Sequence, residues 1–284
     1  MSPTNRNRQE SIISILMWTV AALVTFPFVW LMGDLLWYGW GQLSFNFLFS
    51  PPLNAGRAGG IGPILVSTAL IIGVCMVVAM PIGLGTAVFL SEYTRNDRGF
   101  GQVIRASLDI LAGVPSIVFG LFGNAFFCQT LGLGFSVLSG GLTLACMVLP
   151  IVIRTSEEGV RAVAQDQRFT AAALGLSKHT TLRRILLPGA VPGLLVGGIL
   201  GLGRALAETA ALIFTSGYVD RMPESLMDSG RALAVHIYDL SMNVPGGNPR
   251  AYATAVVLVG LLLSINLVAT RIASRWTSNI LHTA

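Results

Sequence analysis

The sequence predicts an all-α polytopic membrane protein with six transmembrane helices, and two observations carry this prediction. Only 11% of the residues are charged and 53% are hydrophobic, whereas about 25% of the residues of an ordinary soluble domain are charged. Apolar runs of about 18 residues or more, long enough to cross a hydrocarbon layer of about 30 Å, recur along the chain. Because backbone polar groups in lipid must be paired within their own segment, we expect these runs to be helices.

The first expected span follows a polar tail of residues 1–11, which we place in the cytoplasm. The span covers 12 to about 37, far longer than the apolar region of about 7–15 residues in a cleavable signal peptide. Tryptophans gather at its far end, where aromatic rings favour the boundary between membrane and water. A loop rich in proline and glycine then leads to the second span, about 61–90.

Four further spans complete the expected domain. The third, about 108–127, opens on a helix-breaking Gly-Val-Pro segment, and the fourth covers about 136–153. A polar segment of about 154–187 separates the fourth from the fifth, about 188–216, whose glycines offer small faces for close helix contact. A second polar stretch precedes the sixth span, about 251–270.

The basic residues set the expected orientation. With the N-terminus in the cytoplasm, every Lys and Arg falls on that side except Arg204, which lies within a span, and Arg57, Arg221, Arg231 and Arg250. Cytoplasmic loops of membrane proteins carry the excess of basic residues. We therefore expect both termini and the polar segment in the cytoplasm, with 12–284 forming a single transmembrane domain.

Several function classes find no support in the sequence. The basic residues behind the net charge of +5 are spread between apolar spans, so no nucleic-acid partner is expected. No G-x-x-x-x-G-K-[ST], H-E-x-x-H or G-x-S-x-G motif occurs. Cys75, Cys128 and Cys146 lie in apolar runs without metal-binding or disulfide spacing. We expect no enzyme activity, no cofactor and no bound metal.

Within the polar segment, residues 166–188 predict a helix–turn–helix. Asp166 is expected to cap a first short helix, and Gly175 to end it in the left-handed conformation. Ser177 is expected to cap a second helix that runs into Pro188. Phe169 and Leu174 are candidate apolar anchors for a partner, with the basic side chains as their rim. A solvated linker between two spans is the alternative interpretation.

The spacing of this helix–turn–helix resembles the signature loop of ABC-importer permeases. That loop reads E-A-A-x-x-x-G, nine further residues and I-x-L-P, which Gly175 and the Ile-Leu-Leu-Pro of 185–188 fit. Phe169 and Thr170 stand in place of its glutamate and first alanine. The resemblance implies docking into an ATPase subunit. The residues that it assigns to this contact are Arg168, Phe169, Thr170, Ala171, Ala172, Leu174, Gly175, Leu187 and Pro188.

Two further stretches are similar to the permeases of the phosphate-specific importer. They are DILAGVPSIVFGLFG at 109–123 and RALAETAALIFT at 204–215. The AVHIY of 234–238, followed by AYATA at 251–255, is closer to the PstA-type subunit than to its PstC-type partner. The likeness covers roughly 60–275. It implies the ABC type I importer permease fold, in the bacterial or archaeal cytoplasmic (inner) membrane.

The resemblance also implies a function and a set of partners. The chain would form half of the translocation pathway of an ATP-driven importer of inorganic phosphate and would itself hydrolyse nothing. The implied partners are a homologous PstC-type permease, two PstB-type ATP-binding subunits, a periplasmic or extracellular PstS-type phosphate-binding protein, phosphate and membrane lipid. A permease for another oxyanion, such as sulfate, molybdate or phosphonate, is an alternative. A channel or secondary transporter without an ATPase is a second alternative, in which the polar segment only connects two spans.

Two charged pairs are candidates for the substrate pathway. Arg204 and Glu208 lie four residues apart near the middle of the fifth span, where each charge costs about 2.5–3.5 kcal/mol on insertion scales. They form either an ion pair that locks helix packing or an arginine fork that exchanges Glu208 for phosphate oxygens. Arg154 and Glu157, three apart at the cytoplasmic end of the fourth span, are either a second pathway pair or a topological anchor.

The remaining acidic residues receive weaker predictions. Asp34 and Asp109 lie at helix ends that reach water, so we assign them no role. A polar stretch expected on the outer side is a candidate contact for the substrate-delivering protein. Its charged residues are Glu224, Asp228, Arg231 and Asp239.

Overall fold

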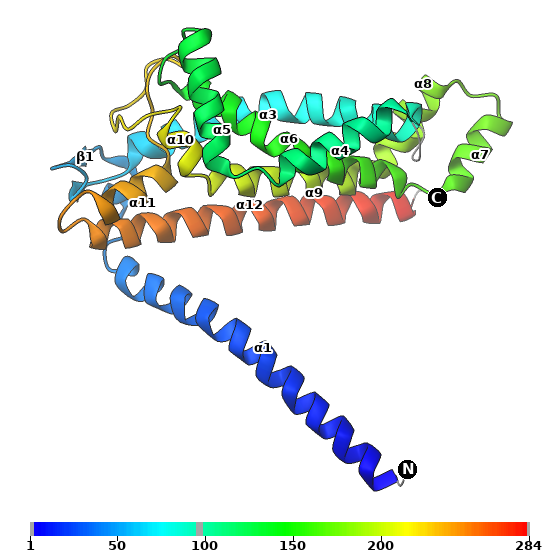
Figure 1. The fold of residues 1–284 in the computed structure, drawn as a ribbon, viewed down its shortest axis with the longest axis horizontal. Helices are drawn as coiled ribbons and strands as arrows, with labels where there is room; N and C mark the ends of the chain where they lie inside the picture. Colours follow the sequence, from blue (N-terminus) through cyan, green and yellow to red (C-terminus); the bar gives the residue numbers. More distant parts are fainter. Residues whose placement is uncertain (1–2, 95–98, 283–284) are drawn as a thin grey trace.

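Three helices form the packed centre of the fold: α3 (Gly62–Val88), α6 (Val137–Arg161) and α9 (Leu187–Leu206). The computed structural model describes residues 3–94 and 99–282, and these helices lie side by side in it (Figure 1). Glycines allow the close approach of α6 and α9, since a Cβ on Gly193 would lie 2.4 Å from the Cα of Gly159. The small faces predicted from the sequence are therefore used within the bundle.

Helix α1 (Pro3–Trp40) leaves the bundle at an angle, whereas α12 (Asn248–His282) runs along it (Figure 1). The two meet at the end of α1, where the rings of Tyr38 and Tyr252 lie 5.4 Å apart. None of the side chains in the apolar window of α1 is buried within the chain. Helix α1 begins at Pro3, and the part of it that is apolar enough to span a membrane begins at Ile12, where the first span was expected.

The third expected span is broken. Helix α4 (Phe100–Ala112) and helix α5 (Ser116–Gly123) meet at an angle of 101°, and α5 continues into the π-helical η2 (Asn124–Thr130). Pro115 lacks the N–H that a continuous helix needs and disfavours helical dihedrals in the residue before it. The Gly-Val-Pro segment breaks the helix as predicted, but it separates two helices instead of opening a single span over 108–127. In the described ranges, five helices are long and apolar enough to span a membrane, or six if the bent pair counts as one.

The predicted helix–turn–helix consists of α7 (Gln165–Ala173) and α8 (Lys178–Thr181). Gly175 has a φ of +66°, and the N–H of Leu176 bonds to the carbonyl of Ala171 at 3.0 Å, which confirms the predicted left-handed end. The hydroxyl of Ser177 caps α8 as predicted. The N-cap of α7, however, is Ala164, so the prediction that Asp166 caps the helix was wrong.

The boundaries of the polar segment differ from those predicted. Helix α6 continues to Arg161, and α8 runs through the π-helical η3 (Leu182–Leu186) into α9. The fifth membrane helix therefore begins before Pro188 and ends at Leu206, and a short α10 (Ala210–Ile213) follows it. The apolar stretch 188–216 is thus two helices.

Small elements cover the other end of the bundle. They are α2 (Phe45–Phe49), the antiparallel strands β1 (Pro52–Leu53) and β2 (Ala58–Gly59), and α11 (Leu233–Met242). The start of α1 and the end of α12 lie toward the end where α7 and α8 lie (Figure 1). This places both termini on the side of the predicted docking segment, and the cytoplasmic assignment stays a prediction. Arg95 and Arg98, assigned to that side from the sequence, lie outside the described residues.

Candidate functional site

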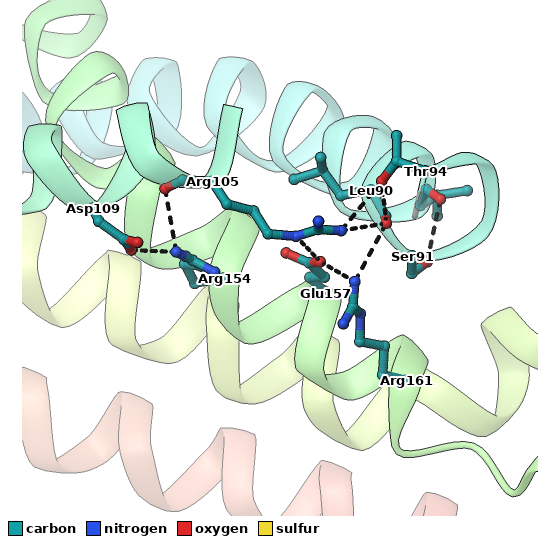
Figure 2. A network of polar contacts seen from close by, with 9 residues as sticks. Leu90, Ser91, Thr94, Arg105, Asp109, Arg154, Glu157 and Arg161 are labelled. Atoms are coloured by element: carbon teal, nitrogen blue, oxygen red, sulfur yellow. Dashed lines mark hydrogen bonds and ion pairs between the residues drawn. The ribbon is translucent and has the colours of Figure 1, made fainter. Parts of the chain in front are cut away.

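A buried carboxylate organises the charged side chains at the α7 end of the bundle (Figure 2). The side chain of Glu157, on α6, is 4% exposed. Its Oε1 lies 2.9 Å from the Nε of Arg105, on α4, and 2.7 Å from the Nη2 of Arg161. Both guanidinium groups also donate to the carbonyl of Leu90, at 2.7 and 3.4 Å. This network ties α4 and α6 to the end of α3.

Arg154 lies at the edge of the same network and pairs with a different residue from the one predicted. Its Nη2 contacts the carboxylate of Asp109 and donates to the backbone carbonyl of Arg105 at 3.2 Å. The predicted pair of Arg154 with Glu157 was therefore wrong. Asp109, to which the sequence assigned no role, is the ionic partner. Asp109 lies four residues after Arg105 and therefore on the same face of α4, and this shared face was the signal that the sequence offered. The sequence did not show that this face of α4 packs against α6.

Arg204 and Glu208 lie at the break between α9 and α10. Arg204 is in the last turn of α9 rather than in the middle of one helix, and the neighbouring Ala205 belongs to the central buried cluster. The side chain of Arg204 is 51% exposed and that of Glu208 only 5%, with 3.9 Å between Nη2 and Oε2. The other carboxylate oxygen, Oε1, accepts the N–H of Ala211 at 3.2 Å. Glu208 is thus held by the backbone, whereas the guanidinium remains accessible.

The helix pair α7–α8 presents apolar side chains outward. Phe169 is 64% exposed and Leu174 is 71% exposed, whereas Ala171 is buried. Leu187 and Pro188 lie in the first turn of α9 and are partly buried. The exposed pair fits the predicted apolar anchors. Thr170 and Ala172 are also exposed on α7, next to these anchors.

At the opposite end of the bundle, residues predicted to contact a partner bond within the chain. Arg231 Nη1 lies 3.0 Å from Asp239 Oδ2, and its Nε donates to the carbonyl of Tyr218 at 2.8 Å. Asp228 accepts the N–H groups of Glu224 and Ser225, which lowers the pKa of its carboxyl. The Arg231–Asp239 pair ties the loop before α11 to that helix, whereas the other contacts lie within the loop.

His236 makes this end of the bundle sensitive to acid. Its ring is buried and its Nδ1 lies 3.3 Å from Nη1 of Arg231. Burial first, and then the charge of Arg231, lower the pKa of His236 from 6.5 to about 4, although Asp239 opposes the shift. The unfolded chain therefore binds a proton at a higher pH than the folded chain does.

We expect the free energy of unfolding to fall as the pH drops from about 6.5 toward 4. The loss reaches on the order of 3 kcal/mol below this window, because one pKa unit corresponds to about 1.4 kcal/mol. Thermal unfolding of the purified protein across this pH range measures the effect. His236→Gln, which does not titrate, should flatten this part of the profile. Equal pH dependence in the two proteins would contradict the assignment.

Comparison with known proteins identifies related sequences over nearly the whole chain. Residues 79–278 match the family of binding-protein-dependent transport system inner membrane components. The chain is 30% identical to the probable ABC transporter permease protein YqgI of Bacillus subtilis, with 98% of each protein covered. It is 33% identical to the phosphate transport system permease protein PstA 1 of Mycobacterium tuberculosis, covering 94% of this chain and 89% of that protein.

Solved structures of ABC transporters share the fold. A chain of the bacterial alginate ABC transporter, in complex with an alginate pentasaccharide-bound periplasmic protein, superposes with a TM-score of 0.66 at 15% identity, covering 96% of both chains. A chain of the inward-facing MetNI methionine ABC transporter gives 0.58 at 18% identity, covering 76% of this chain and 94% of that one. These likenesses confirm the predicted permease fold.

Proposed function

The chain belongs to the family of binding-protein-dependent transport system inner membrane components, and on that premise we propose that it carries inorganic phosphate. It is a permease subunit of an ABC transporter, a multi-pass protein of the inner membrane and not an enzyme. We propose further that the chain is the PstA-type subunit and that it forms half of the pathway of an ATP-driven phosphate importer.

One observation carries the choice of phosphate. The identity of 33% to a phosphate transport system permease extends over 94% of this chain and therefore includes the segments around Arg154 and Arg204. Arginine suits this cargo, because its planar guanidinium can donate two parallel hydrogen bonds to phosphate oxygens. The half-exposed guanidinium of Arg204 supports the same choice.

The charged pairs have different roles in this proposal. Arg204 and Arg154 offer guanidinium groups to phosphate along the pathway. Glu208, fixed by the N–H of Ala211, holds Arg204 between passages of the anion. Glu157 acts indirectly, because it fixes Arg105, whose backbone carbonyl accepts a bond from Arg154. Its buried carboxylate repels no anion, since two arginines neutralise it.

The surfaces of the chain suit the partners of such a complex. The uncovered apolar side chains of α1 require lipid or a second permease around them, and we assign the second permease to the PstC type. The exposed anchors Phe169 and Leu174 suit a cleft in a PstB-type ATPase subunit. A PstS-type binding protein delivers phosphate at the α11 end.

Reconstitution of the four-component complex tests this function. Proteoliposomes that contain both permeases and the ATPase should import radiolabelled phosphate only with ATP inside and the binding protein outside. A tenfold excess of sulfate, molybdate or phosphonate should leave the initial rate unchanged. Competition by one of these anions would assign the chain to that oxyanion instead. Import that persists without the ATPase subunits would support a channel or secondary transporter.

A further inference from the structure

Arg168, on α7, points back into the protein instead of outward with the docking side chains. Its Nη1 forms an ion pair with the carboxylate of Glu92, and its Nη2 donates to the carbonyl of Val160 at 2.8 Å. Val160 lies in the last turn of α6, where backbone carbonyls lack partners within the helix. One guanidinium therefore joins α7 to α6 and to Glu92, in the π-helical segment η1 (Phe89–Tyr93) that ends α3.

The second helix of the pair contacts the same segment. Lys178, the first residue of α8, lies with its Nζ 5.9 Å from the centre of the Tyr93 ring, within range of a cation–π interaction. A cavity of about 180 Å³ lies between η1 and the helix pair. Apolar packing is therefore incomplete there, and the contacts of Arg168 and Lys178 bridge the gap.

Segment η1 is also where the arginine network of Figure 2 converges. The carbonyl of Leu90, within η1, accepts hydrogen bonds from Arg105, Arg161 and Thr94. Segments of π-helix leave backbone carbonyls available in this way and are frequent at functional sites. A displacement of η1 would therefore act on α3, α4 and α6 together.

We propose that Arg168 is a positioning residue that transmits movement of the docked helix pair to α3 through Glu92. The chain itself and the bond of Arg168 to the Val160 carbonyl join α7 to α6, and the Arg168–Glu92 pair adds an ionic link to the segment that ends α3. The proposal rests on the proposed function, because it takes α7 and α8 as the docking site of the ATPase subunit. It assigns Arg168 to coupling inside the permease rather than to contact with that subunit.

The test uses the reconstituted complex and measures phosphate imported per ATP hydrolysed. Arg168→Gln and Glu92→Gln should each lower this ratio by about three- to tenfold, the range expected for a partly exposed charge-assisted contact. Co-purification of the ATPase subunits and their hydrolysis rate should stay within about twofold of the parent complex. Exchange of the two residues, Arg168→Glu with Glu92→Arg, should restore part of the ratio, because it rebuilds the ion pair between α7 and η1 but not the bond to the Val160 carbonyl.

Further variants keep the result interpretable. Gln167→Ala changes an exposed side chain on the same helix and should leave the ratio unchanged. Arg168→Lys keeps the positive charge but not the planar guanidinium, so it should give an intermediate ratio of phosphate imported to ATP hydrolysed. This variant also tests the proposal if Arg168→Gln does not insert into the membrane. An unchanged ratio in both single variants, or no recovery in the exchange, would overturn the proposal.

Loss of ATPase co-purification would make Arg168 a docking contact instead. A parent complex without ATP-dependent import would overturn the proposed function itself.

Discussion

Replacing Arg204 with alanine is expected to lower phosphate import about 10- to 100-fold while the complex still assembles. The side chain is half exposed at the break after α9, and its contact with Glu208 is long, at 3.9 Å. Its removal therefore costs little packing but takes away a two-pronged donor to phosphate, worth about 1.5–3 kcal/mol. Initial rates of radiolabelled phosphate import, at matched amounts of inserted protein, measure the change.

Two variants separate the pathway role of Arg204 from a packing role. Arg204→Lys keeps the charge without the planar fork, so import should be intermediate. Glu208→Gln keeps an oxygen for the N–H of Ala211 and removes only the ionic partner, so the half-saturating phosphate concentration should change more than assembly does. Normal import by the alanine variant would show that the pair serves helix packing alone.

The largest effect on stability is expected from Glu157→Gln. The carboxylate is buried and neutralises Arg105 and Arg161, and the side chain of Arg105 is only 12% exposed. The substitution leaves two guanidinium groups facing each other without a counter-charge. Breaking a buried ion pair from one side typically costs about 3–5 kcal/mol. Thermal unfolding in detergent should therefore occur at a markedly lower temperature.

Asp109→Asn provides the matched control within the same network. Its carboxylate pairs with Arg154 at the exposed edge, where the side chain of Asp109 is 64% exposed. Exposed ion pairs contribute under about 1 kcal/mol, so the unfolding temperature should change little. Similar losses in the two variants would mean that burial of Glu157 does not set the strength of the network.

The helix pair was predictable because its signals are local. Gly175 ends α7 through its own dihedral freedom, and Ser177 caps α8 through a bond three residues away. Apolar runs likewise indicated the membrane helices, but the positions predicted for the ends of these helices were less accurate. The break between Leu206 and Ala210 lies inside an apolar stretch, where hydropathy does not distinguish one helix from two.

The sequence by itself determined that the chain is a helical membrane protein, where its polar helix pair lies, and which arginines interrupt its apolar segments. Only the tertiary structure decided the partners of those charges. Glu157 pairs with Arg105, 52 residues away, and Arg168 pairs with Glu92, 76 residues away. An ion pair needs its two groups within about 4 Å. That distance depends on how α4 and η1 pack against α6 and α7, which no local pattern encodes.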